Sequence, residues 1–109
     1  MNLADYKWKK RVLLVFSPTA ADPRFTRQLA IFAENKAGYD DRDLVEMHAI
    51  GNMEMRLRNM FRVSPPDFAV ILVGKDGNEK HRWTDIAPMD QINHRIDRMP
   101  MRRQEMKEK

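Results

Sequence analysis

Residues able to do nucleophilic, metal or acid–base chemistry are few and scattered in this sequence of 109 residues. It has no cysteine, which excludes thiolate nucleophiles, thiol–disulfide exchange and thiolate metal sites. His48, His81 and His94 do not form a metal-ligand pattern, since Asp90, four residues before His94, supplies only a single pair. The acidic run at 40–43 lacks the glycine and the final glutamate of a calcium loop. We therefore predict no metal, no cofactor and no catalytic residue.

Methionine is the one chemically soft residue present in number, with nine copies. Two Met-x-Met pairs, at 53–55 and 99–101, have the form of thioether ligands for copper(I). Packing explains the apolar methionine positions without a metal, because a flexible thioether fills irregular gaps in a core. We expect core packing for Met47, Met53, Met60, Met89 and Met99.

The net charge of +4 is carried by the two ends of the chain. Residues 1–11 and residues 95–109 each carry a net +3, which leaves the middle slightly acidic. The sequence thus has a basic N-terminal arm, residues 1–10, and a basic, methionine-rich tail, residues 99–109. Basic ends attract polyanions, but interleaved acidic residues weaken that attraction, so solvated termini are the simpler interpretation.

Hydrophobic patterning divides the chain into short elements that would position these side chains. Asp22 and Pro23 are a typical cap and first residue of a helix. Asp76-Gly77 is a strong hairpin signal, and Pro100 is expected to end or kink the last helix. The predicted strands are 11–16, 44–50, 68–73 and 79–84, and the predicted helices are about 23–37, 53–62 and 89–99.

This order predicts a single α/β domain over residues 1–109, with a four-stranded mixed sheet (β-α-β-α-β-β-α) flanked by three helices. A helical crossover makes the first two strands parallel, and the tight turn makes the last two antiparallel. An exposed sheet edge also allows a homodimer. No apolar run is long enough to span a membrane. No signal peptide is visible in residues 1–10, so the expected compartment is the cytoplasm.

Three segments resemble a known family: 12–18 followed by Asp22-Pro23, the run 70–77 that ends Gly-Lys-Asp-Gly, and Ile-Asp-x-Met-Pro-Met-Arg at 96–102. They are similar to a bacterial domain family of unknown function. Related domains occur in vertebrate extracellular-matrix proteins, including sushi-repeat proteins and one named for a coiled-coil region. The resemblance implies a thioredoxin-like fold, and many bacterial members look exported.

A thioredoxin-like fold normally carries reactive thiols at the start of its first helix, where residues 19–25 contain none here. Phe16-Ser17-Pro18 resembles a peroxiredoxin loop, but the threonine and cysteine that should follow are absent. The cis-proline that precedes the third strand in thioredoxins is also displaced. Pro65 and Pro66 lie about three residues too early, and either peptide bond is a candidate for the cis form.

We therefore predict a non-catalytic thioredoxin-like binding domain whose partner is another protein. Trp83 would suit a binding hot spot if it is exposed, whereas the alternative is that it covers the last helix. Polyanion binding, to nucleic acid or glycan, through Trp8 and its basic neighbours stays open, as does an enzyme of unrecognised type. The candidate binding residues are Thr19, Asp22 and Arg24 at the first helix, His81, Arg82 and Trp83 on the edge strand, and Arg98, Arg102 and Arg103 in the tail.

Overall fold

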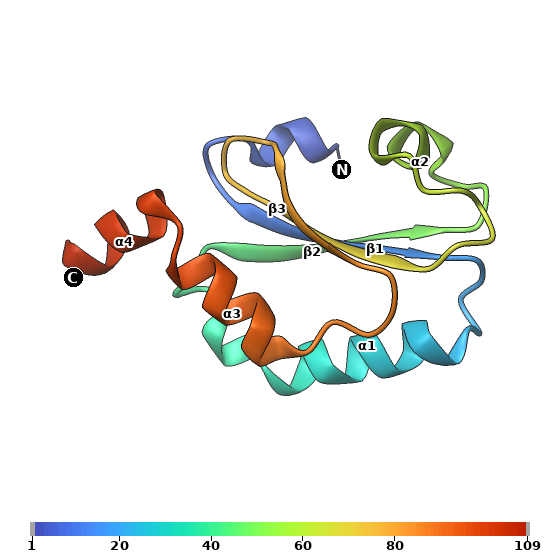
Figure 1. The fold of residues 1–109 in the computed structure, drawn as a ribbon, viewed down its shortest axis with the longest axis horizontal. Helices are drawn as coiled ribbons and strands as arrows, with labels where there is room; N and C mark the ends of the chain where they lie inside the picture. The colour runs from blue at the N-terminus through green and yellow to red at the C-terminus, as the bar shows by residue number, and fades with distance from the viewer. Residues whose placement is uncertain (1, 109) are drawn as a thin grey trace.

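The computed structural model describes residues 2–108 as one four-stranded sheet with helices on both faces (Figure 1). The strand order is β2-β1-β3-β4. The strands are β1 (Arg11–Ser17), β2 (Leu44–Ile50), β3 (Ala69–Val73) and β4 (Glu79–Trp83). The helices are α1 (Pro23–Glu34), α2 (Met55–Phe61), α3 (Met89–Asp97) and α4 (Pro100–Lys107), with short 3-10 turns η1 (Leu3–Tyr6) and η2 (Lys36–Gly38).

The pairing of the strands confirms the predicted mixed sheet. β1 runs parallel to β2, and β3 runs antiparallel to both β1 and β4. β1 and β3 are buried along their whole length, because each has a neighbour on both sides and helices over both faces. They are the two most apolar runs in the sequence. β2, which also carries Glu46 and His48, and the polar β4 form the edges.

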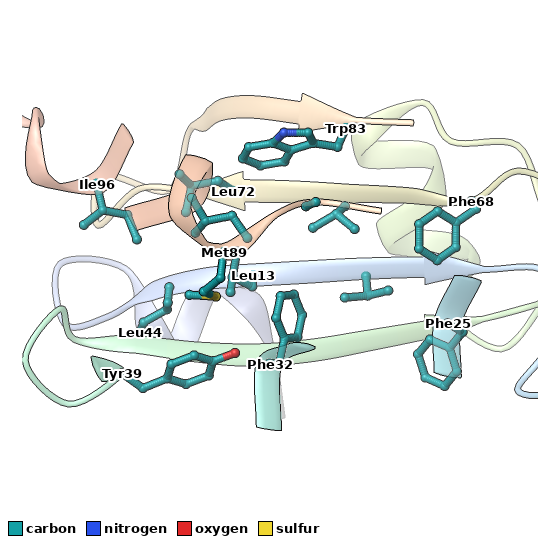
Figure 2. Close-up of a cluster of buried hydrophobic side chains, with 14 residues drawn as sticks. Leu13, Phe25, Phe32, Tyr39, Leu44, Phe68, Leu72, Trp83, Met89 and Ile96 are labelled. Carbon is teal, nitrogen blue, oxygen red and sulfur yellow. The ribbon is translucent and has the colours of Figure 1, made fainter. Parts of the chain in front are cut away.

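Alternate residues of the central strands feed two hydrophobic cores on opposite faces of the sheet. Leu13 and Leu72 face α1 and α3, together with Phe25, Phe32 and Ile96 (Figure 2). Val12, Leu14 and Ile71 face η1 and α2 on the other side, with Leu57 and Phe61. Helical periodicity in the sequence predicted the apolar stripe of α3 correctly, since Met89, Ile92 and Ile96 are all buried.

The main difference from the predicted fold is the fourth helix. Pro100 does not only end α3; it is also the first residue of α4, where its fixed φ suits a helix and its missing N–H is not needed. α4 extends beyond the end of the sheet (Figure 1). α1 also ends at Glu34, earlier than predicted, and a separate turn covers 36–38.

Some expected core positions are on the surface instead. Met53 is 86% exposed and Met60 is 60% exposed, because α2 begins at Met55 and turns Leu57, Arg58 and Phe61 inward. Met89 packs in the core as expected, with Met99 against it. The peptide bonds described are all trans, including those before Pro65 and Pro66. Among residues 2–108 there is no helix long and apolar enough to cross a membrane.

Candidate functional site

The two ends of β1 define two regions with different chemistry. We call the surroundings of Ser17, α1's first turn and the loop before β3 the helix-start end. Here the Asp22 carboxylate caps α1 by accepting the Arg24 backbone N–H at 2.9 Å. It also accepts two bonds from the Arg24 guanidinium, at 3.0 and 2.8 Å. The same guanidinium lies 5.0 Å from the Phe68 ring centre.

This pairing leaves few free hydrogen-bond donors for an added anion at the start of α1. The hydrogen bonds from Arg24 lower the pKa of Asp22, and Asp22 raises the pKa of Arg24. The carboxylate is therefore charged at neutral pH and repels a second anion. Thr19 lies exposed before this turn, where its carbonyl accepts the Ser17 hydroxyl at 2.7 Å. Asp22 and Arg24 thus act first as a helix cap.

A small cavity of about 340 Å³ remains at the helix-start end. Arg24, Arg62 and Arg82 line it from α1, the end of α2 and β4, beside residues 66–69. Arg82 is already fixed, because its guanidinium bonds both Glu79 oxygens and the Phe61 carbonyl. The structure thus brings two predicted residues, Arg24 and Arg82, to one cavity, with both guanidinium groups engaged by the protein itself.

Arg58, in the middle of α2, is a buried structural centre of this end. Its side chain donates to four carbonyl oxygens, those of Ser17 and Gly51 at 2.8 Å, Ser64 at 2.7 Å and Asp67 at 3.4 Å. Burial lowers the pKa of Arg58, since the charge is held mainly by neutral carbonyls. The only sequence signal was a cation next to buried Leu57, one turn before a proline-rich loop.

Trp83 is buried, so the hypothesis of an exposed hot spot is wrong and the alternative holds. Its indole N–H donates to the Gln91 side chain on α3 at 3.0 Å, and the ring joins the core under that helix (Figure 2). His81 packs edge-on against Trp83 with ring centres 4.5 Å apart. Burial, followed by the charge of Arg95, lowers the pKa of His81. The Trp83 indole is therefore part of the hydrophobic core and does not lie on an exposed surface.

The opposite region, around Arg11 and the β3–β4 turn, holds the larger hollow, which we call the groove. Its volume is about 780 Å³, and it runs between that turn and the junction of α3 and α4. Five cationic side chains and one carboxylate line it, alongside Met99, Pro100 and Met101. The charged lining residues are Arg11, Lys75, Asp76, Lys80, Arg95 and Arg98.

Part of this charge is neutralised by an ion-pair cluster that holds α4 to the sheet. Glu105 bonds the buried Arg11 guanidinium through both oxygens at 3.1 Å, and Lys75 Nζ at 2.7 Å. Lys75 also bonds Asp43 at 2.8 Å. Burial alone would lower the pKa of Lys75 and raise that of Glu105. The hydrogen bonds of Lys75 with Asp43 and Glu105, and those of Glu105 with Arg11 and Lys75, outweigh burial and reverse both directions. Both groups are therefore charged at neutral pH.

A second cluster explains the arginine of the 96–102 motif. Arg102 is 3% exposed, and it bonds Asp41 at 2.7 Å and Asp97 at 3.2 Å. Arg42 completes the cluster by donating two hydrogen bonds to the Asp97 carboxylate. The prediction that Arg102 offers a free basic surface is therefore wrong, because two carboxylates hold it inside. Arg103, its neighbour on α4, is exposed.

Arg95 and Arg98 are the groove's unpaired cations, since neither has an ion pair among the described residues. They lie three positions apart at the end of α3, on the groove wall beside the 43%-exposed Met101. Two of the three family-like segments of the sequence, 70–77 and 96–102, meet here. Gly74–Asp76 forms one wall, and Met99–Met101 forms the other. Sequence spacing gave no sign of this convergence, because the two motifs are brought together by tertiary contacts: the packing of α3 on β4 and the ion pair between Lys75 and Glu105.

The N-terminal arm lies against the same turn. The backbone N–H of Trp8 donates to the Lys75 carbonyl, and the Lys7 side chain lies next to Gly77. Trp8 is 61% exposed, with the Lys7 ammonium 5.7 Å from its ring centre. Both basic ends of the chain therefore gather at the groove end of the molecule.

The fold places the protein in the thioredoxin-like class. It superposes on a reduced 2-Cys peroxiredoxin of Plasmodium vivax with a TM-score of 0.74, over 89% of this chain and 81% of that one, at 14% identity. It also matches StoA of Bacillus subtilis with a TM-score of 0.60, over 79% of this chain and 81% of that one, at 10% identity. At such low identity the likeness concerns the fold alone.

Within that class, the chain belongs to the DUF4174 family, a domain of unknown function whose sequence model matches residues 2–105. It is 25% identical over 120 residues to the sushi repeat-containing protein SRPX of rat and of human, covering 95% of this chain and 26% of each relative. It is 26% identical over 133 residues to zebrafish coiled-coil domain-containing protein 80, covering 95% of this chain and 15% of that protein. The chain thus spans about a quarter or less of these relatives.

Proposed function

We propose that this domain is a non-catalytic binding module, and that the groove holds an acidic, partly apolar segment of another protein. The observation that carries the proposal is the pairing of two free arginines, Arg95 and Arg98, with the exposed Met101 along one groove wall. Arginine recognises carboxylates through paired N–H donors, and a thioether adapts to varied apolar side chains.

The chain's own Glu105 supports this choice of ligand. Its carboxylate lies between Arg11 and Lys75, both of which line the groove. This is the arrangement that a carboxylate of a partner would make with Arg95 and Arg98 further along. Charge complementarity of this kind raises the rate of association and selects against basic partners.

Among the titrating groups of the groove, Lys75 and Asp76 suit binding better than acid–base catalysis. The pKa of Lys75 is raised, and the pKa of Asp76 is lowered by its hydrogen bond with Lys80. Acid–base catalysts need a pKa near neutrality, and both shifts move away from it. The protein also has no thiol to perform the chemistry named in its peroxiredoxin neighbour.

Fluorescence anisotropy with a short labelled peptide of glutamate and interspersed leucine tests the proposal. We expect saturable binding that a glutamine-for-glutamate peptide does not show. The double variant Arg95→Glu with Arg98→Glu should weaken binding by at least about tenfold. Its matched control, Arg27→Glu with Arg56→Glu, makes the same change in net charge at exposed sites away from the groove. Equal losses in the two double variants would overturn the groove as the binding site.

Polyanion binding has one specific observation in its favour, the exposed Trp8 among lysines beside the same groove. An aromatic face next to cations suits a stacked base or a sugar ring. Retention on heparin at about 50 mM salt, lost steeply at higher salt and on Trp8→Ala, supports this second candidate. Absence of retention at that salt concentration rules it out.

A further inference from the structure

We infer that two copies of this domain associate by pairing their β2 strands about a two-fold axis at Met47, which extends the sheet from one copy into the next. β2 and β4 are the two edges of the sheet, each bonded to a single neighbour. A free edge offers a row of N–H and C=O groups to another strand. The groove lies beside β4, so association through β2 is separate from ligand binding.

The sequence of β2 is nearly symmetric in character about Met47. Going outward from Met47, Glu46 matches His48, Val45 matches Ala49, and Leu44 matches Ile50. In an antiparallel pair about a two-fold axis, these matched residues lie directly opposite each other across the two copies. Each apolar side chain then faces an apolar one, and each Glu46 carboxylate faces an imidazole.

Neighbouring registers lose this complementarity. Opposed residues must point to the same face of the sheet, so the axis has to pass through a residue. Centring it on Glu46 opposes two carboxylates, and centring it on His48 opposes two imidazoles. Only the Met47 register pairs unlike groups, which fixes the geometry of the interface.

The β2 edge also has the surface that such contact requires. Val45 and Met47 are half-buried on the face of α2 and η1, where they pack at the rim of the second core. On the other face, Glu46 already interacts with Lys36 at 3.3 Å and with His48 at 3.8 Å. Its second oxygen is buried without a hydrogen-bond partner among the described residues. A second copy would cover the exposed His48 that screens this carboxylate.

The other edge is built against the same association. In β4, a two-fold axis at Lys80 or at Arg82 opposes identical cations, and an axis at His81 sets Lys80 against Arg82. Each of these three registers therefore opposes like charges, and charged side chains are a known protection of sheet edges. Because the β2 edge is self-complementary and the β4 edge is not, we assign the interface to β2 and its occupant to a second copy of the same chain.

A single cysteine tests the register, because the protein has none of its own. Directly opposed residues in an antiparallel pair have Cα atoms about 4.5–5.5 Å apart, within disulfide range. We expect Met47→Cys to form a covalent dimer with diamide, while the edge control Lys80→Cys stays monomeric. Equal cross-linking of the two variants, or none in either, overturns the β2 interface.

Sedimentation of the cysteine-free protein supplies the second measurement. The average mass should rise over a series from about 1 µM to about 1 mM, as expected for a small, weak interface. Met47→Lys, which opposes two cations at the axis, should abolish the rise, while Lys80→Ala should leave it unchanged. Hydrogen exchange of the wild type checks the result without mutation: β2 amides should gain protection with concentration. Concentration-independent mass and exchange would overturn the inference.

Discussion

The two ends of β1 use buried arginine in opposite ways. At the helix-start end, Arg58 is surrounded by backbone carbonyls and holds three loops together without a carboxylate bond. At the groove end, Arg11 and Arg102 are each paired with carboxylates, and further cations nearby stay free. The end where the thioredoxin-like class would hold reactive thiols has thus become structural. The cations without an ion pair among the described residues, Arg95 and Arg98, lie at the other end.

The comparison has a simple physical basis. Carbonyl oxygens belong to the backbone, so an arginine that bonds four of them fixes chain positions and keeps at most one of its five N–H donors for a ligand. Carboxylates belong to side chains on α4 and on the loop before β2, and they neutralise only some of the local cations. An excess of cations therefore remains beside the groove, and we propose that it serves recognition.

The largest effect on stability is expected when Arg58, the centre of the helix-start end, is removed. We expect Arg58→Ala to lower the free energy of unfolding by about 3–5 kcal/mol, because several buried carbonyls lose a charged donor together. Urea denaturation measures the change. The exposed neighbour Arg56→Ala is the matched control, with an expected change below about 0.5 kcal/mol. Similar midpoints for the two variants would show that Arg58 does not hold this end together.

Glu105→Gln tests the groove end. We expect a loss of about 2 kcal/mol, because Arg11 stays buried without its carboxylate while its bond to the Arg42 carbonyl survives. Hydrogen exchange should show faster opening of α4 than of β1. Glu108→Gln, on the exposed side of the same helix, should leave both quantities unchanged. An unaltered α4 in Glu105→Gln would mean that the ion pairs do not fasten this helix.

The groove end should also make stability sensitive to acid. Arginine and lysine partners hold the pKa values of Asp43, Asp97 and Glu105 below their ordinary range. A lowered folded-state pKa contributes stability above the unfolded pKa and loses it as pH falls through the folded value. Unfolding free energy should therefore decline below about pH 5. Glu105→Gln should show a shallower decline in denaturation curves taken at several pH values, and an equal slope would contradict the assignment.

The smallest effect is expected for the free cations of the groove wall. Arg95→Gln and Arg98→Gln should each change the unfolding free energy by less than about 0.5 kcal/mol, since neither has an ion pair in residues 2–108 to lose. Thermal denaturation checks this, together with the peptide-binding assay. A large loss of stability would place these arginines with Arg11 and Arg102 as structural cations.

Local sequence patterns predicted features that depend on residues within two helical turns. They missed contacts between residues that are distant in the sequence. The cap at Asp22 and the stripe Met89, Ile92 and Ile96 follow from neighbours within two turns. Buried Gln28 escaped notice because its partner, the Ala87 backbone, lies 59 residues away and bonds both ends of its amide. Arg102 was misjudged for the same reason, since Asp41 lies 61 residues before it.

The sequence alone determined the strand and helix order, the mixed sheet and the absence of thiol chemistry, because these depend on local periodicity, turn residues and composition. Tertiary structure decided which arginines are buried, that Trp83 belongs to the core, and that Glu105 ties α4 to Arg11 at the start of β1. It also joined the Gly74–Asp76 and Met99–Met101 walls into one groove. The physical reason is that a charge is neutralised by whatever lies near it in space, and spacing along the chain does not specify that neighbour.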